Sequence, residues 1–292
     1  MILMKKAVPV WVKDREKEMN LTLGFRCIFQ TGENQNCKLK ITASTLYRIY
    51  LNGEFLGYGP ARAAHNYFRV DLYELDKLIR KGKNILAIEV AGYNVNGYYT
   101  LDQPSFLQAE VESEGRIIVS TGSDPGFEAF QIKERLQKVE RYSYQRPFTE
   151  YYRLKEDHDK WKTHKEVKVE SLNLIILPRI KLLPRSLPLP PFDIVHPVSV
   201  SSEGTIQFTE PEEYYKDRSL TNISDIYKGY KESELEVYPA SMTVQKFRSV
   251  IMDNSAKEYA VNDKISLYEN QFCTFDMGVN LSGFTGGKIS CT

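Results

Sequence analysis

The stretch CKLKITASTLYRIYLNGEFLGYG, residues 37–59, decides the fold class of this 292-residue chain. It contains two runs rich in β-branched and aromatic residues, 37–44 and 45–51, followed by the pair Asn52-Gly53 and a third such run. Asn-Gly between runs of this kind is a strong signal for a β-hairpin, because both residues tolerate positive φ angles. The stretch therefore predicts antiparallel β structure.

Further short strands are predicted beyond this hairpin, at 84–93, 105–113 and 116–122, with Glu114-Gly115 as a second turn. Helical spacing of leucines occurs in DLYELDKLIRKGKN, residues 71–84, which predicts one short helical turn between strands. Short strands at nearly regular spacing are typical of an antiparallel β-sandwich or jelly roll and not of alternating β-α units.

A proline-rich stretch, ILPRIKLLPRSLPLPPFDIVHP at 176–197, holds six of the thirteen prolines and predicts an extended connection packed along a surface. We therefore expect an all-β chain with a first β-sandwich at 1–170, a linker at 171–197 and a second β-sandwich at 198–292. The second unit offers few strand candidates, the last being 286–292, so we expect it to be incomplete. Its open sheet edge could pair with a second copy in a homodimer.

Composition excludes several classes of protein. Lys and Arg number 39 and Asp and Glu 38, so the net charge of +1 gives no basic surface for nucleic acid. No apolar run approaches the roughly 20 residues of a membrane span, and we expect no membrane partner. The lysines follow the apolar N-terminal residues, which is the wrong order for a secretory signal. We expect a cytoplasmic protein as written, or a periplasmic or secreted one if a signal segment has been removed.

The cysteines have no CxxC spacing, and a chain of this length does not need disulfides to hold a core. We predict free, buried thiols in preference to a bridge between the first two; the four residues are Cys27, Cys37, Cys273 and Cys291.

A metal-ligand cluster is suggested by His158 with Asp157, Asp159 and His164. The surrounding run of mixed charges, residues 153–170, favours a solvated loop or helix face instead. We predict no metal site and no cofactor. Nucleotide-binding loops, a nucleophile elbow and zinc motifs are absent from the sequence. No sequence pattern singles out two of the acidic residues as a catalytic pair.

A polar and aromatic cluster, GYNVNGYYTLDQPSF at 92–106, is the candidate binding site. Rings pack on the apolar faces of sugars, while amides and carboxylates bind the hydroxyl groups. A loop packed by its tyrosines against a neighbouring domain fits the same residues, and both readings stay open. The candidate carbohydrate-binding residues are Tyr93, Asn94, Asn96, Tyr98, Tyr99, Asp102 and Gln103.

A second cluster, RYSYQRPFTEYYRL at 141–154, has the same ambiguity. Arg146 and Glu150 could form a structural ion pair. The aromatic residues Tyr144, Phe148 and Tyr152 could form the buried face of a strand.

Four stretches together carry a resemblance to a known family: residues 7–29, 41–63, 67–90 and RYSYQRPFTEYYRL. In order and spacing they resemble the N-terminal region of bacterial α-L-rhamnosidases of glycoside hydrolase family 78. FDMGVNLSGF, residues 275–284, is similar to the segment that leads those proteins toward their catalytic domain.

The resemblance implies an all-β region whose first β-sandwich, 1–170, is galactose-binding-like. It also implies that an (α/α)6 barrel follows, which carries the acidic catalytic residues and usually inverts the anomeric centre. Long amphipathic helices are missing from the sequence, so we expect the barrel to be absent. We also expect no catalytic residue among residues 1–292. This chain alone is predicted to be inactive as a rhamnosidase. The expected function is that of a non-catalytic N-terminal accessory region of an α-L-rhamnosidase-like glycoside hydrolase, an enzyme that acts on rhamnose-containing glycans. The alternatives are a stand-alone carbohydrate-binding module and a structural β-sandwich without glycan binding.

Overall fold

The chain forms two compact units. The computed structural model describes residues 3–290 except 33–35, 99, 142, 209, 211, 215–217, 240, 243–246, 254–256 and 259–263. The first unit comprises Met1–Pro190 and Lys216–Ala240, and the second comprises Pro191–Tyr215 and Ser241–Thr292. The first unit thus takes in most of the predicted linker together with a segment of the predicted second sandwich.

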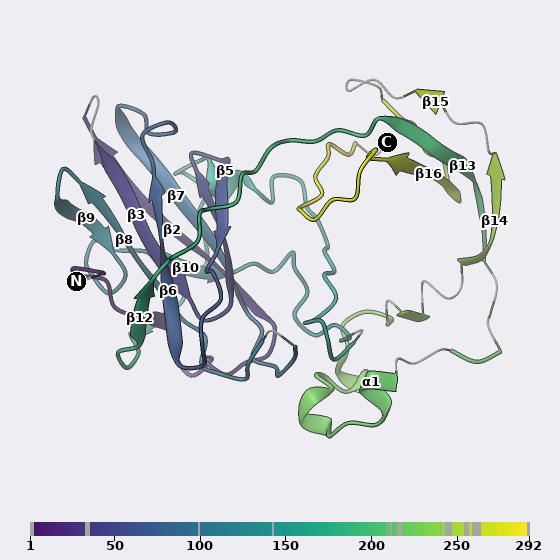
Figure 1. Ribbon diagram of the computed structural model, residues 1–292, viewed down its shortest axis with the longest axis horizontal. Helices are drawn as coiled ribbons and strands as arrows, with labels where there is room; N and C mark the ends of the chain where they lie inside the picture. The colour runs from purple at the N-terminus through teal and green to yellow at the C-terminus, as the bar shows by residue number, and fades with distance from the viewer. Residues whose placement is uncertain are drawn as a thin grey trace. The chain divides into compact units, whose positions relative to one another are not determined.

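Two facing sheets build the first unit (Figure 1). The larger sheet has the order β11-β1-β8-β3-β6-β12, with β9 also paired to β8, and the smaller has the order β10-β2-β7-β4-β5. The strands are β1 (Val10–Val12), β2 (Leu21–Thr31), β3 (Cys37–Ala43), β4 (Leu46–Leu51), β5 (Glu54–Gly59), β6 (Tyr67–Glu74), β7 (Gly82–Gly92), β8 (Leu107–Ser113), β9 (Arg116–Ser120), β10 (Glu128–Gln131), β11 (Leu174–Ile176) and β12 (Lys181–Pro184). The all-β sandwich predicted from the sequence is confirmed in this unit.

The core lies between the two sheets because alternate residues of each strand point inward. Strand β2 lies between β10 and β7 in the smaller sheet and pairs with β7 along its whole length, from Leu21 opposite Gly92 to Thr31 opposite Gly82. Its inward-facing side chains are almost fully buried: Leu21, Leu23, Phe25, Cys27 and Phe29. This strand was missing from the sequence prediction, although its strict alternation was visible.

The hairpins predicted at Asn52-Gly53 and Glu114-Gly115 are both present. Asn52 and Gly53 have φ angles of 54° and 88° between β4 and β5, and Glu114 and Gly115 have φ angles of 48° and 80° between β8 and β9. The left-handed conformation at both positions of each turn matches the twist of the flanking strands.

The helical turn predicted over 71–84 is wrong for most of its length. Residues up to Glu74 belong to β6, and β7 begins at Gly82. Only the connection bends like a helix, where the Ile79 N–H donates to the Leu75 carbonyl. Leucines three and four residues apart mimic helical spacing here, but Leu72 is exposed while the flanking Asp71 and Tyr73 are buried. Pairing with β3 decides in favour of the strand.

The proline-rich segment adds two strands to the larger sheet. β11 pairs antiparallel with β1, and β12 pairs parallel with β6 at the sheet edge, where a proline is tolerated. Arg185 fixes the segment further, because its Nη1 lies 2.9 Å from Oδ1 of the fully buried Asp71. The segment therefore packs along the sandwich, as its leucines predicted.

Residues 216–240 hold short helices on the first unit: α1 (Arg218–Thr221) and the 3-10 helices η2 (Asp225–Tyr227) and η3 (Glu232–Glu234). The Tyr230 hydroxyl donates to the Met19 carbonyl oxygen at 2.5 Å, and Tyr230 packs with Val237 on a small apolar cluster around Tyr93 and Phe148. A further 3-10 helix, η1 (Lys160–Lys162), lies earlier in the chain.

The described residues of the second unit form one sheet around β13 (Ser199–Phe208). It pairs antiparallel with β14 (Phe247–Asp253), β15 (Lys257–Glu258) and β16 (Gln271–Asp276). The incomplete second sandwich stays a prediction. Residues 286–290 are irregular and not the predicted strand, and 291–292 lie outside the described residues.

The thiols of Cys27 and Cys37 are free and buried, as predicted, so no bridge joins them. Burial raises the pKa of both thiols. Cys273 is half-buried, and Cys291 lies outside the described residues. Within the described part of the chain, no helix is long and apolar enough to cross a membrane.

Candidate functional site

The inner part of the predicted loop is structural. Tyr93 and Asn94 are each only 5% exposed. The Asn94 Nδ2 donates to the carbonyl oxygens of Glu16 and Glu18, at 3.0 and 2.8 Å. The Gln103 Nε2 donates to the carbonyl oxygen of Ser44 at 2.8 Å. These amides are engaged in holding backbone segments together. The Nδ2 of Asn94 and the Nε2 of Gln103 are therefore already bonded to backbone carbonyl oxygens.

The outer part of the loop reaches solvent. Tyr98 is 77% exposed and Asp102 is also exposed, while the half-buried Asn96 accepts a hydrogen bond through Oδ1 from the Asp102 N–H at 3.0 Å. Tyr99 lies outside the described residues. Residues 96–102 of this loop thus offer one exposed ring, one exposed carboxylate and one half-buried amide.

The second predicted cluster is organised by Arg141 and not by a strand. Residues 141–150 form no strand in the described part of the segment, so the predicted strand face is wrong. The buried Arg141 donates through Nε to the carbonyl of Arg146 and through Nη2 to the carbonyl of Tyr144, both at 2.8 Å. Phe148 is buried as predicted, in the same apolar cluster as Tyr93.

Glu150 forms an ion pair with Arg135, whereas the sequence suggested a pair with Arg146. Its Oε1 lies 3.6 Å from Nη2 of the buried Arg135. Tyr152 donates to the other carboxylate oxygen at 3.0 Å and accepts from Arg48 Nη2 at 3.4 Å. Burial raises the pKa of the Tyr152 hydroxyl, which keeps it protonated as a donor to Glu150. These charges fasten the segment to the smaller sheet.

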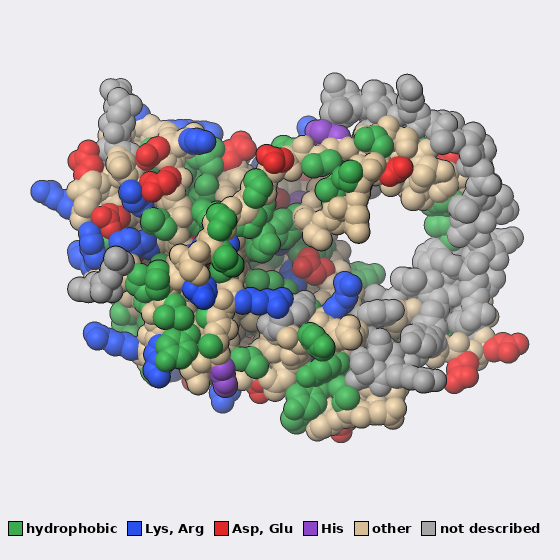
Figure 2. Space-filling view, viewed as in Figure 1, with side chains coloured by type: hydrophobic (Ala, Val, Ile, Leu, Met, Phe, Trp, Pro, Cys, Tyr) green, Lys and Arg blue, Asp and Glu red, His purple; other side chains and the backbone are tan. Residues whose placement is uncertain are grey.

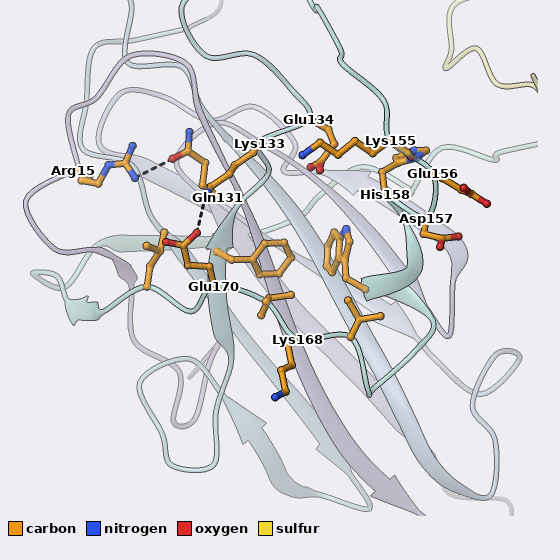
Figure 3. A pocket seen from close by; sticks show the side chains of 15 residues that line it. Arg15, Gln131, Lys133, Glu134, Lys155, Glu156, Asp157, His158, Lys168 and Glu170 are labelled. Carbon is orange, nitrogen blue, oxygen red and sulfur yellow. Dashed lines mark hydrogen bonds and ion pairs between the residues drawn. The ribbon is translucent and has the colours of Figure 1, made fainter. Parts of the chain in front are cut away.

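A groove of about 500 Å³ lies against the smaller sheet, between β10 and residues 155–172 (Figure 3). Phe130 and Trp161 meet edge to face beneath it, with ring centroids 4.9 Å apart. Gly24 of β2 makes room for this pair, because a Cβ atom there would lie 2.5 Å from Cζ of Phe130. Val167, at the groove wall, accepts a hydrogen bond from the buried Arg26 at 2.9 Å through its carbonyl.

Charged side chains surround this groove. The Lys133 Nζ lies 2.6 Å from Glu170 Oε2, and Arg15 Nη1 donates to Gln131 Oε1 at 3.2 Å, as the dashed lines of Figure 3 mark. Other rim residues have no side-chain hydrogen bond or ion pair to any described residue: Glu134, Lys155, Glu156 and Lys168.

Sequence reasoning missed this groove. Trp161 was part of a charge run that we interpreted as a solvated face, yet it is only 6% exposed. The signal available was a lone tryptophan among charges. His158 lines the groove, and its Nε2 lies 3.4 Å from Oδ2 of Asp159. Among the described residues no three metal-ligating side chains gather in one place.

The comparisons give one informative likeness. The chain matches the GH78 family rhamnosidase of Bacillus sp. GL1 with a TM-score of 0.62 and 24% identity, over 70% of this chain and 22% of that one. The α-L-rhamnosidase of Streptomyces avermitilis matches with a TM-score of 0.46 and 17% identity, over 65% and 21% of the two chains. The enzyme of Aspergillus terreus matches with a TM-score of 0.48 and 12% identity, over 93% and 36%.

No protein-family model matches the chain, and no curated protein does. The chain spans between about a fifth and a third of the length of the three rhamnosidases. At 24% identity the likeness to the Bacillus enzyme concerns the fold. This chain therefore has the β-sandwich fold found in part of a GH78 family rhamnosidase.

Proposed function

We propose that this chain is a non-catalytic accessory region of an α-L-rhamnosidase-like glycoside hydrolase and that it contacts rhamnose-containing glycans. The observation that supports this most is the fold shared with 22% of a GH78 family rhamnosidase. A region of this size in a much longer enzyme fits a supporting or glycan-contacting role better than a complete active centre. The catalytic barrel would then be supplied outside this sequence.

The proposed glycan contact is the tip of the 93–103 loop. The exposed ring of Tyr98 offers an apolar face to a sugar, while the Asp102 carboxylate and the Asn96 amide provide acceptors and donors for hydroxyl groups. The buried Asn94 keeps the loop in one conformation, which lowers the entropic cost of binding. A single exposed ring predicts weak affinity, about millimolar or roughly −4 kcal/mol.

Titration of the full chain with rhamnose-containing oligosaccharides, followed by NMR, tests this proposal. We expect saturable shifts of the amides from residue 96 to 102 and their loss in Tyr98→Ala. Tyr268→Ala is a matched control, because Tyr268 is also 77% exposed but lies in the other unit. If the loop amides do not move, the structural-sandwich alternative is the better one. If the chain binds sugars and its gene encodes no barrel, the stand-alone binding module would be favoured.

The non-catalytic role is tested by hydrolysis of an aryl α-L-rhamnoside. Inverting hydrolysis needs an acid and a base roughly 6.5–9.5 Å apart around a sugar pocket. We expect no turnover by the purified chain. Turnover that disappears when an acidic residue within 1–292 is changed would refute the proposal.

A further inference from the structure

The groove between β10 and residues 155–172 has the chemistry of a second ligand site. Its volume of about 500 Å³ lies within the roughly 300–1,000 Å³ range of small-molecule sites. Phe130 and Trp161 are mostly buried beneath it, and the half-buried Val167, Val169 and Leu172 extend the apolar floor. A ligand with an apolar face fits this floor.

The rim selects for an uncharged ligand. Four basic residues, Arg15, Lys133, Lys155 and Lys168, are balanced there by four acidic residues, Glu134, Glu156, Asp157 and Glu170. Figure 3 shows Lys155 and Lys168 on opposite sides of the groove, with Glu134 beside Lys155. An anion placed among them would meet repulsion as well as attraction. Figure 2 shows the same mixing of signs on the face of the molecule that it draws.

The unpaired rim groups supply hydrogen bonds. The carboxylates of Glu134 and Glu156 accept from hydroxyl groups, and the ammonium groups of Lys155 and Lys168 donate to them. Because none of the four is committed to another described residue, a ligand does not need to break an existing ion pair to reach them. Hydroxyl groups around an apolar ring face are the pattern that a sugar presents.

We propose that this groove binds a short uncharged oligosaccharide. The site differs from the loop tip at Tyr98, and the proposal rests on the proposed carbohydrate role without depending on rhamnose. The floor takes the apolar face of a sugar ring, and the rim carboxylates and ammonium groups take its hydroxyl groups.

The two tryptophans of the chain provide the readout. Trp161 lies in the groove, whereas Trp11 is fully buried in the core. The Trp11 indole N–H donates to the carbonyl oxygen of the rim residue Arg15 at 3.2 Å, so its signal reports only indirect effects at the rim. Cellotriose, maltotriose and the rhamnosyl disaccharide rutinose are titrated into the labelled full chain, with trigalacturonate as the anionic counterpart. We expect at least one neutral sugar to shift the Trp161 indole N–H signal saturably and by more than the Trp11 signal.

A charge-altering variant tests the rim. In Glu134→Gln with Glu156→Gln, loss of two charge-assisted acceptors should weaken the neutral sugar about fivefold or more. The same variant leaves the rim basic, so trigalacturonate should now bind. Glu114→Gln with Glu213→Gln is the control, because both residues are exposed, lie outside the groove and carry the same charge change.

Three results would overturn the groove proposal. One is no movement of Trp161 with any neutral sugar up to roughly 50 mM, well above millimolar affinity. Another is tighter binding of trigalacturonate than of the neutral sugars to the unaltered chain. The third is equal weakening in the rim variant and its control. If the loop amides near Tyr98 shift while Trp161 does not, the groove proposal fails and the proposed function stands.

Discussion

Arg185→Ala should destabilise the first unit strongly, because it removes one partner of a buried carboxylate. The Asp71 side chain is inaccessible to solvent, and its two oxygens are held by Arg185 Nη1 at 2.9 Å and by the hydroxyl of Tyr47. The same arginine donates to the carbonyl oxygens of Leu187 and Pro188, at 2.8 and 3.1 Å. Its loss leaves a buried negative charge and releases the strand-bearing segment.

The expected cost is about 3 kcal/mol. Removing one partner of a buried ion pair costs roughly 3–5 kcal/mol. The lower end applies because Tyr47 keeps its hydrogen bond to Asp71 and because the Arg185 side chain is 13% exposed, so water can partly replace it. For a unit of this size, 1 kcal/mol corresponds to about 2–4 °C, so the melting temperature should fall by roughly 6–12 °C.

Urea and thermal unfolding followed by circular dichroism measure this change. Arg179→Ala is the control, since Arg179 lies exposed on the same segment with no hydrogen bond or ion pair to a described side chain, and it should change stability by less than about 0.5 kcal/mol. Asp71→Asn combined with Arg185→Ala should recover part of the loss, because the stranded charge is gone. Equal stabilities of Arg185→Ala and Arg179→Ala would refute the reasoning.

Three further outcomes are expected. In native protein at neutral pH, Cys27 and Cys37 should react with a thiol reagent far more slowly than in denaturant, because burial raises the pKa of both thiols; fast native labelling would contradict their placement. Hydrogen bonds from Arg15 lower the pKa of Glu18, so the pair's stabilisation is present above the usual glutamate pKa and is lost as pH falls through the lowered value. Glu18→Gln should therefore show a smaller loss of stability between neutral and acidic pH, and an unchanged acid profile would disprove this. The edge of β16 away from β13 pairs with no described strand, so we expect concentration-dependent dimers in sedimentation experiments; a monomer at all concentrations would rule out edge pairing.

Local sequence determined the hairpins and half of the strands of the first unit. Asn52-Gly53 and Glu114-Gly115 specify their turns because the required positive φ angles depend on a few neighbouring residues. Alternating apolar residues likewise specify a strand that has one face on a core. Helical periodicity failed at 71–84, where leucines three residues apart fit a helix but pairing with β3 selected the strand.

Tertiary structure alone decided the sites. Asn94 and Tyr98 are four residues apart and both suit a sugar by composition, yet one is 5% exposed and the other 77%. Their difference comes from the backbone around residues 16–18, which the fold brings next to Asn94. The groove depends in the same way on Phe130 and Trp161, which lie 31 positions apart and meet only when the later segment covers the smaller sheet. Turn geometry and alternation are short-range properties, so the sequence carries them directly, whereas exposure and the meeting of distant side chains exist only once the sheets have packed.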